Sequence, residues 1–235
     1  RAETGHPVGQ IFGYVHDRLF TEDDFKDVEN GVLKDGVPKQ TFTAKVRPGD
    51  IKYVDLDKNG FIDTYDQMAI GGTENPEIVY GFGVNLRWKE LDFGAMFQGI
   101  GRTWRILSSN IMPASNKGSM YNIFDNYQDR WTVDNQSQDV FYPRADYGPN
   151  ANNSQKSTWW LRNMSFLRLK NLELGYSCPK KWLQGFVISN ARVFVRGTNL
   201  LTFSKFNLWD PELATGDGAK YPAMKSVSVG FDITF

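Results

Sequence analysis

Twelve consecutive residues, from Asp55 to Asp66, carry oxygen-bearing side chains at the spacing of a loop that binds a divalent cation. In that template, side chains at positions 1, 3, 5, 9 and 12 and a backbone carbonyl at position 7 supply ligand oxygens, and a glycine at position 6 makes the sharp turn. Gly60 occupies position 6, and Ile62 at position 8 would anchor the loop on neighbouring apolar surface. The predicted ligands are Asp55, Asp57, Asn59, Phe61 (through its carbonyl), Asp63 and Asp66.

Calcium is the cation that suits these oxygens best, because a hard cation offsets the mutual repulsion of four carboxylates within one short loop. Asp66 stands where the template has a bidentate glutamate, and its shorter reach is expected to lower the affinity. A weak site still fills where calcium is millimolar, as it is outside cells. We therefore predict a structural calcium ion that fixes the loop over residues 45–72. The alternative is a solvated Asp/Asn/Gly turn without a metal.

Few other residues suggest chemistry. His6 and His16 are too few and too separated for a zinc or catalytic site, and no nucleophile, phosphate-loop or HExxH motif is present. The single cysteine, Cys178, rules out an internal disulfide. Aromatic side chains in the long loops could stack on sugar rings, although packing within the loops is the plainer role for each one. The main candidates are Trp104, Trp131, Trp159 and Trp209, followed by Tyr121, Trp160 and Tyr221.

The composition favours strands and turns over helices. Among 235 residues, 14% are aromatic and 22 are glycine. Lys+Arg and Asp+Glu both number 27, so the net charge is zero and gives no basic field to attract nucleic acid. No stretch approaches the roughly 18 consecutive apolar residues of a membrane helix. The first residues resemble the middle of a longer sequence, so we expect a fragment or a processed chain.

Apolar and polar residues alternate with a period of two over several stretches, which is typical of a β-strand with one apolar face. The alternation is strict over residues 226–235. It is also clear over 79–88, where a tight turn at Lys89-Glu90 joins it to the next run. Over 165–177 the apolar phase slips near Lys170-Asn171, which predicts a bulge. We expect strands near 8–16, 79–88, 91–100, 165–177, 187–200 and 225–235.

The connections between these strands alternate in length. They are long over 17–78, 101–163 and 201–222, and short over 88–90 and 178–185. Transmembrane β-barrels show this alternation, with short turns on one side of the membrane and long loops on the other. We therefore predict an all-β fold of antiparallel up-and-down transmembrane β-barrel strands with long extracellular loops, in preference to a soluble β-domain. Six strands fall short of the eight that the smallest such barrels need, so further strands must come from elsewhere.

Several motifs, spread in order along nearly the whole chain, are shared with one known family. They include Gly-Gln-Ile-Phe-Gly-Tyr at 9–14, Gly-Asp-Ile-Lys-Tyr-Val-Asp at 49–55 and Gly-Gly-Thr-Glu-Asn-Pro at 71–76, and further motifs at 80–83, 97–99, 165–172, 174–176, 199–202, 210–212 and 229–235. On these motifs the chain resembles the C-terminal portion of the SusC/RagA-like TonB-dependent outer-membrane transporters.

The resemblance implies that the chain contributes strands to a barrel of about 22 strands. It places this barrel in the outer membrane of a Gram-negative bacterium of the Bacteroidetes type. It also implies that the protein is a transporter and not an enzyme. Members of the family import glycan or peptide fragments, pair with a SusD-like surface lipoprotein that acts as a lid, and are powered through TonB. Their plug domain and TonB-contacting segment lie N-terminal to the part that this chain resembles. A terminal aromatic in the family is a signal for the barrel-assembly machinery, which would give Phe235 that role.

Two other interpretations fit parts of the same sequence. A secreted, calcium-dependent carbohydrate-binding β-domain would also combine alternating strands with a calcium loop. A dockerin-like module is a weaker alternative, because such modules use paired calcium loops and this chain has a single one. The need for detergent on extraction separates the transporter from both.

Overall fold

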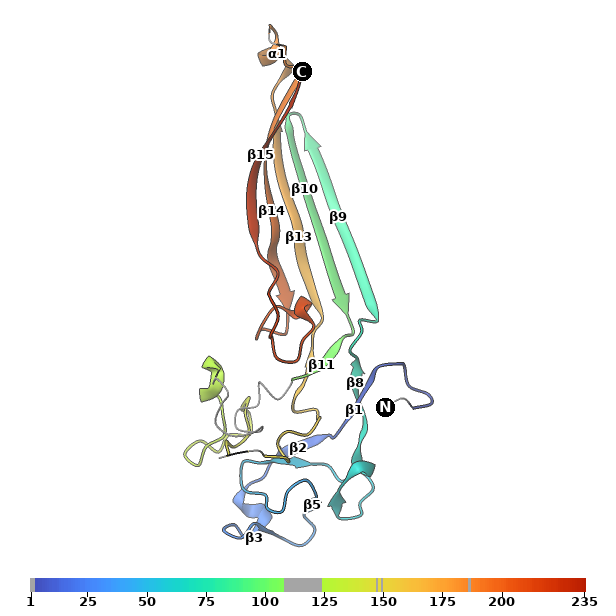
Figure 1. Cartoon of the computed structure of the whole chain (residues 1–235), viewed down its shortest axis with the longest axis vertical. Helices are drawn as coiled ribbons and strands as arrows, with labels where there is room; N and C mark the ends of the chain where they lie inside the picture. Colours follow the sequence, from blue (N-terminus) through green and yellow to red (C-terminus); the bar gives the residue numbers. More distant parts are fainter. Residues whose placement is uncertain (1–2, 108–123, 147, 149, 186) are drawn as a thin grey trace. The chain divides into compact units, whose positions relative to one another are not determined.

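The computed structural model describes residues 3–107, 124–146, 148, 150–185 and 187–235. The chain divides into two compact units. The loop unit consists of residues 1–74 and 104–162, and the sheet unit of residues 75–103 and 163–235. The sheet unit is built mainly from long antiparallel β-strands, and the loop unit joins short β-strands through long irregular segments (Figure 1). No helix among the described residues is long and apolar enough to cross a membrane.

Five long strands form one antiparallel sheet in the described part of the sheet unit. They follow the order β15-β14-β13-β10-β9 and lie side by side as long ribbons in Figure 1. Their bounds are β9 Ile78–Trp88, β10 Leu91–Gly101, β13 Phe166–Ser177, β14 Asn190–Ser204 and β15 Ser226–Thr234, and the short helix α1 (Lys180–Leu183) lies between β13 and β14. At 9 to 15 residues each, the strands are longer than those usual in soluble proteins.

One face of this sheet is apolar because the alternation stays in register from strand to strand. Val84 on β9 pairs with Ala95 on β10, and Val195 on β14 pairs with Val229 on β15. Side chains on this face are largely exposed, as at Leu86 (60%) and Val229 (63%). The sheet therefore presents an uncovered apolar surface along its length.

The connections and irregularities within the sheet agree with the sequence pattern. Lys89, in the turn between β9 and β10, takes φ +55°, the left-handed conformation that favoured two-residue hairpin turns use. The register between β10 and β13 skips Lys170, so the predicted bulge is confirmed. On its other side, the register between β13 and β14 skips Asn199 and Leu200, with Asn199 also left-handed at φ +55°.

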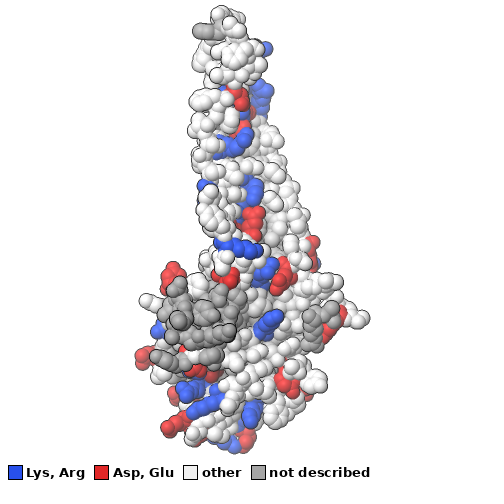
Figure 2. All heavy atoms as spheres, in the orientation of Figure 1, with Lys and Arg blue, Asp and Glu red and all other residues white. Residues whose placement is uncertain are grey.

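The opposite face of the sheet carries ion pairs that link four strands. The Arg192 guanidinium on β14 donates to Asp92 on β10 at 2.5 and 3.0 Å. It also donates to Glu173 on β13 (2.6 Å) and to Asp232 on β15 (3.2 Å). Arg196, four residues further along β14, donates to Glu173 at 2.6 Å. Basic and acidic side chains accordingly lie beside one another along the sheet in Figure 2.

Gly175 on β13 makes room for this network. A Cβ atom at residue 175 would lie 2.6 Å from either carboxylate oxygen of Asp92 and closer still to the Arg192 guanidinium. Any other residue there would push these two charged groups apart. The ion pair across β13 thus depends on the absence of a side chain between its partners.

The loop between β14 and β15 is fastened to the sheet by a buried arginine. Arg168 on β13, with its side chain 2% exposed, forms ion pairs with Asp210 and with Glu212 (3.0 Å). Asp210 also caps the short helix η4 (Pro211–Leu213) by accepting from the backbone N–H of Glu212 at 3.0 Å. The Nζ of Lys170 adds a contact to Glu212 at 3.2 Å. These charges hold the loop against β13.

The loop unit is built from short strands that mostly pair across long sequence separations. β1 (Gln10–Gly13) pairs with β8 (Met68–Thr73), β2 (His16–Leu19) with β6 (Ile51–Tyr53), β3 (Phe25–Asp27) with β4 (Val32–Leu33), and β11 (Trp104–Ile106) with β12 (Leu161–Asn163). β5 (Lys39–Gln40) pairs in parallel with β7 (Phe61–Ile62), and the short helices are η1 (Glu22–Asp24), η2 (Thr64–Asp66) and η3 (Asp125–Gln128). Leu19, Phe20 and Ile51 are completely buried at the centre of the unit.

The single barrel strand predicted over residues 8–16 is wrong. Two short strands, β1 and β2, occupy this range, and both pair within the loop unit. The chain changes partners at Tyr14, whose N–H donates to the Lys156 carbonyl and whose carbonyl accepts from the Thr158 N–H, both at 2.9 Å. The five-stranded sheet therefore lacks a strand from this segment, and five of the six predicted strands join it.

Candidate functional site

The predicted calcium loop brings three of its carboxylates together. One oxygen each of Asp55, Asp57 and Asp66 lies within 4.8 Å of the other two. Asp66 is buried, Asp55 is partly buried and Asp57 is exposed, so the cluster reaches solvent on the Asp57 side. Carboxylate oxygens at this spacing can surround one hard divalent cation.

The backbone between these residues turns tightly at the glycine. Gly60 takes φ +85° and Lys58 takes φ +61°, a left-handed conformation that costs glycine little. The N–H of Gly60 donates to Oδ2 of Asp55 at 2.8 Å. The N–H of Asn59 donates to Oδ1 of Asp57 at 3.1 Å. These bonds orient two of the clustered carboxylates from within the turn.

Asp66 and Ile62 attach the loop to the rest of the unit. The two oxygens of Asp66 accept from the backbone N–H groups of Leu56 (2.7 Å) and Asp63 (2.8 Å), which closes the loop from its far end. Ile62 is completely buried, and its carbonyl accepts from the Thr41 hydroxyl at 2.6 Å. The prediction that Ile62 anchors the loop is therefore confirmed.

Two features of the cluster fit a bound cation. The Oδ1 atom of Asp55 is buried and accepts no hydrogen bond in the described structure, although buried polar atoms normally have a partner. Among the described residues, no Lys or Arg forms an ion pair with Asp55, Asp57 or Asp66. A calcium ion would supply both the missing partner and the missing positive charge.

Two other predicted ligands have different partners here. Asp63 does not belong to the carboxylate cluster, because its Oδ1 accepts from the N–H of Tyr65 at 2.7 Å and caps η2. The Oδ1 of Asn59 accepts from the N–H of Phe61 at 2.8 Å. Asp and Asn side chains readily accept from backbone two residues ahead, and this local preference competes with metal binding. Coordination by Asn59, Phe61 and Asp63 stays a prediction.

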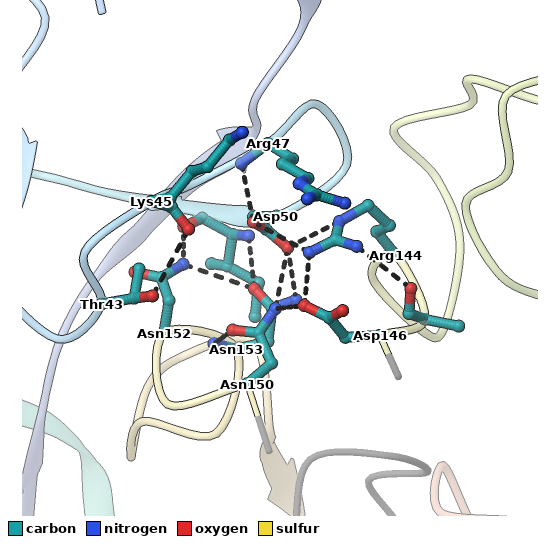
Figure 3. A network of polar contacts seen from close by, with 11 residues as sticks. Thr43, Lys45, Arg47, Asp50, Arg144, Asp146, Asn150, Asn152 and Asn153 are labelled. Carbon is teal, nitrogen blue, oxygen red and sulfur yellow. Dashed lines mark hydrogen bonds and ion pairs between the residues drawn. The ribbon is translucent and has the colours of Figure 1, made fainter. Parts of the chain in front are cut away.

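A second polar site, which the sequence did not reveal, surrounds Asp50. Its carboxylate is 1% exposed and accepts from Arg144 through Nε at 3.1 Å and Nη2 at 3.4 Å. It also accepts from the Nδ2 atoms of Asn150 (3.0 Å) and Asn153 (2.9 Å) and from the N–H of Arg47 (2.8 Å), as Figure 3 shows. Four of these five donors belong to residues 144–153, far along the chain. The network therefore ties two distant segments of the loop unit together.

Side-chain amides extend this network along strand β6. Asn152 donates through Nδ2 to the carbonyl of Ile51 at 2.7 Å, and Asn153 accepts from the N–H of Ile51 at 2.8 Å. The hydroxyl of Tyr53 donates to the Asn152 carbonyl at 2.7 Å. The indole N–H of Trp160 donates to the Asn153 carbonyl, also at 2.7 Å. The two asparagines thus satisfy backbone groups that a neighbouring strand would otherwise satisfy.

Burial sets the electrostatics of this site. Desolvation raises the pKa of Asp50, and the Arg144 guanidinium beside it opposes that rise. Burial alone would lower the pKa of Arg144, but the charges of Asp50 and Asp146 outweigh it and raise the pKa. Burial also raises the pKa of Tyr53, so its hydroxyl keeps the proton that it donates to Asn152. Arg144 therefore favours the charged form of the buried Asp50 carboxylate.

The tryptophans predicted to stack on ligands make contacts within the protein. Trp131 is 5% exposed and packs on Gly49 (φ +87°), where a Cβ atom would collide with the indole ring. Trp159 is 8% exposed and lies edge-on to His16, with ring centroids 5.3 Å apart. Its indole N–H donates to the Phe141 carbonyl at 3.2 Å. Burial leaves these two rings little surface for a ligand.

The remaining aromatic candidates are placed differently. The ring of Trp104 lies against Gly71, where a Cβ atom would come within 3.1 Å of it. Trp209 packs edge-on against Phe206, with ring centroids 4.8 Å apart. Trp160 is buried, Tyr221 is exposed, and Tyr121 lies outside the described residues. Ligand stacking stays a prediction for these aromatics.

Comparison with known sequences finds TonB-dependent receptors. TonB-dependent receptor P26 of Formosa agariphila is 32% identical over 202 residues, which is 80% of this chain and 20% of that receptor. TonB-dependent receptor P3 of the same organism is 27% identical over 248 residues, covering 98% of this chain and 22% of the receptor. TonB-dependent receptor SusC of Bacteroides thetaiotaomicron is 24% identical over 205 residues, which is 85% of this chain and 19% of that receptor. No protein-family model matches the chain.

Comparison with solved structures finds a transporter of the same type. The RagAB peptide importer in its open-open state matches 96% of this chain and 22% of the solved chain, with a TM-score of 0.68 and 26% identity. Its closed-closed state matches with a TM-score of 0.66 and 27% identity.

The chain spans about a fifth of the length of the relatives that it matches. TonB-dependent receptors of this kind reside in the outer membrane and are transporters, not enzymes. The chain is therefore homologous to one segment of the SusC/RagA-type TonB-dependent receptors.

Proposed function

We propose that this chain forms part of the barrel wall, together with its long loops, of an outer-membrane transporter of the SusC/RagA type. The observation that carries the proposal is the five-stranded sheet, with an exposed apolar face on one side and ion pairs on the other. A membrane barrel faces lipid outside and water inside, and so requires both faces. A soluble sheet would bury its apolar face under a second layer.

The rest of the receptor would complete the barrel. Strands β9 and β15 form the two edges of the sheet, and an open edge in lipid would leave backbone groups unsatisfied. We infer that these edges pair with other strands of a barrel of about 22 strands. The plug domain and the TonB-contacting segment would likewise belong to the remaining four fifths of the protein.

The proposed cargo is glycan or peptide fragments, taken up together with a SusD-like surface lipoprotein and powered through TonB. The RagAB peptide importer as a structural relative supports peptides, and SusC as a sequence relative supports membership of this transporter type. The long connections of such barrels lie outside the cell, where cargo and lipoprotein are met. A secreted carbohydrate-binding domain fits less well, because it gives no reason for an exposed apolar face on a sheet of long strands.

Arginine at Val84 tests whether the apolar face meets lipid. Val84 lies in the middle of β9 on the apolar face, and a cation there is expected to cost about 2–4 kcal/mol in a membrane barrel. The full-length receptor carrying Val84→Arg should reach the folded, heat-modifiable form in outer membranes in much lower yield. The matched control is Asn85→Arg, on the polar face of the same strand, which should assemble normally. Equal assembly of the two variants, or recovery of the receptor without detergent, would contradict the proposal.

We also propose that the loop from Asp55 to Asp66 holds a structural calcium ion. The three clustered carboxylates, the unpartnered Oδ1 of Asp55 and the buried Ile62 anchor support it. With dissociation constants of about 0.1–1 mM for extracellular sites and calcium at about 2 mM, binding would stabilise the loop by about 1 kcal/mol. The ion would hold together a turn whose carboxylates otherwise repel one another.

Chelation followed by limited proteolysis tests the calcium proposal. For purified full-length receptor in detergent, EDTA should speed cleavage within residues 45–72 by about fivefold, and added calcium should reverse this. The double variant Asp55→Asn, Asp57→Asn should be cleaved at one rate with or without EDTA. If EDTA leaves cleavage of the unaltered loop unchanged, the loop holds no structural calcium.

A further inference from the structure

A pocket of about 450 Å³ lies in the loop unit beside the Asp50 network. Three arginines line it: Arg47, Arg130 and Arg144. Apolar side chains, among them Val28 and Val133, complete its walls. A volume of this size, and a lining that combines apolar side chains with a few charged groups, are typical of sites for small ligands.

The walls of the pocket are held in place by the fold. The backbone N–H of Arg144 donates to the Gly49 carbonyl at 2.8 Å, and its guanidinium is fixed by Asp50 and by Asp146 at 2.7 Å. On the other wall, the N–H of Trp131 donates to the carbonyl of Tyr142 at 3.0 Å. A pocket whose walls are preorganised loses less entropy when a ligand binds.

Two of the three arginines have no acidic partner in the part of the chain that the structure describes. Arg47 is exposed, and neither it nor Arg130 forms an ion pair with any described residue. The guanidinium of Arg130 lies 4.6 Å from the ring centroid of Tyr127 and donates to the Tyr127 carbonyl at 3.0 Å, contacts that orient it without neutralising it. Figure 3 shows Arg47 joining the network through its main chain. Glu22 is the acidic residue in the described lining.

We infer that this pocket binds the carboxylate of a short peptide, an inference that rests on the proposed transport of fragments and narrows their chemistry. Arginine guanidinium groups bind carboxylates in bidentate geometry. The apolar walls suit a peptide's aliphatic side chain better than the hydroxyl groups of a sugar. Trp131, the aromatic in the lining, is 5% exposed and offers no open ring face for a sugar to stack on.

Calorimetric titration of the purified full-length receptor in detergent tests the inference. The probe is the tripeptide Ala-Val-Glu, and its counterpart is Ala-Val-Gln with an amidated C-terminus. Arg47→Gln and Arg130→Gln should each weaken binding of the acidic peptide at least about tenfold, because each removes a charge-assisted hydrogen bond. Arg102→Gln, an exposed arginine outside the pocket, should change nothing. Glu22→Gln should tighten binding, because it removes the negative charge from the lining.

Several outcomes would overturn the inference. If the acidic and the amidated peptides bind equally, the receptor does not recognise a carboxylate. If the Arg47→Gln, Arg130→Gln and Arg102→Gln variants bind the acidic peptide equally, the peptide does not bind in this pocket. If an oligogalacturonate binds and the peptide does not, and if this binding requires Arg47 and Arg130, the ligand of the pocket is a sugar acid and not a peptide. Titration does not depend on transport. If the receptor binds the peptide through these arginines but imports nothing, only the proposed function is contradicted. If the variants that lack these arginines still import peptides, only this inference is contradicted.

Discussion

Replacing Arg144 by methionine is expected to destabilise the loop unit by about 3–5 kcal/mol, because it leaves the buried carboxylate of Asp50 without its counter-charge. Methionine retains much of the arginine's apolar volume, so the loss is mainly electrostatic. Hydrogen exchange of backbone amides over residues 45–54 and 150–154 of the full-length receptor measures it, since these amides belong to the segments that the network joins.

A second variant separates charge from packing at this site. Combining Arg144→Met with Asp50→Asn should recover much of the lost protection, because no unpaired charge then remains buried. Lys26→Met, which breaks an exposed ion pair with Asp35, should change stability by less than about 1 kcal/mol. If the double variant is as unprotected as Arg144→Met alone, the counter-charge is not what Arg144 contributes.

Replacing Arg168 by methionine is expected to release the loop between β14 and β15 from the sheet. Its side chain is 2% exposed and serves both Asp210 and Glu212. We expect a loss of about 3 kcal/mol, the lower part of the range for buried pairs, because Glu212 is about a third exposed. Proteolysis of the full-length receptor within residues 205–222 should rise accordingly.

The neighbouring lysine provides the matched control for that loop. Lys170 also contacts Glu212, at 3.2 Å, but its side chain is 29% exposed. Lys170→Met should therefore cost less than about 1 kcal/mol and leave the loop protected. Equal cleavage of the two variants would show that burial of Arg168 is not what fastens the loop.

The long strands could be predicted because their signal is local. Over residues 226–235 each residue differs from the next in polarity, and this stretch forms β15, which pairs with residues 190–198 of β14. The bulge at Lys170 could be located for the same reason, since a slip of one residue in the alternation is visible in the sequence itself. A strand can be predicted from its period-two pattern without knowing which strands it pairs with.

The loop unit could not be predicted in this way. β1 and β2 have four residues each, too few for a periodic signal, and their partners are more than 30 residues away. Asp50 finds Asn150 and Asn153 about 100 residues further along the chain. Their amide side chains look in sequence like those of any polar loop. Only the folded backbone brings these donors to one buried carboxylate.

The candidate metal site lies between these two cases. Template spacing predicted that Asp55, Asp57 and Asp66 would converge, and they lie within 4.8 Å of one another. It did not predict the position of Asp63, because the same residue type that binds a cation also caps a helix. Spacing identifies which oxygens can meet, whereas local backbone geometry decides which of them do so.

The bulge in β13 has a consequence for how this strand can change in evolution. Before Lys170 the odd-numbered residues Leu167 and Leu169 pair with the apolar face of β10, and after it the even-numbered Leu172 and Leu174 do. Leu169 and Asn171 already pair with consecutive residues of β10, so deleting the codon for residue 170 would keep these leucines on one face and Arg168 on the other. Exchanging that codon for another leaves the parity of the strand intact. On its β10 side, β13 therefore tolerates the loss or the replacement of residue 170 without exchanging its faces, whereas the loss of a paired residue would exchange them on one side of the deletion.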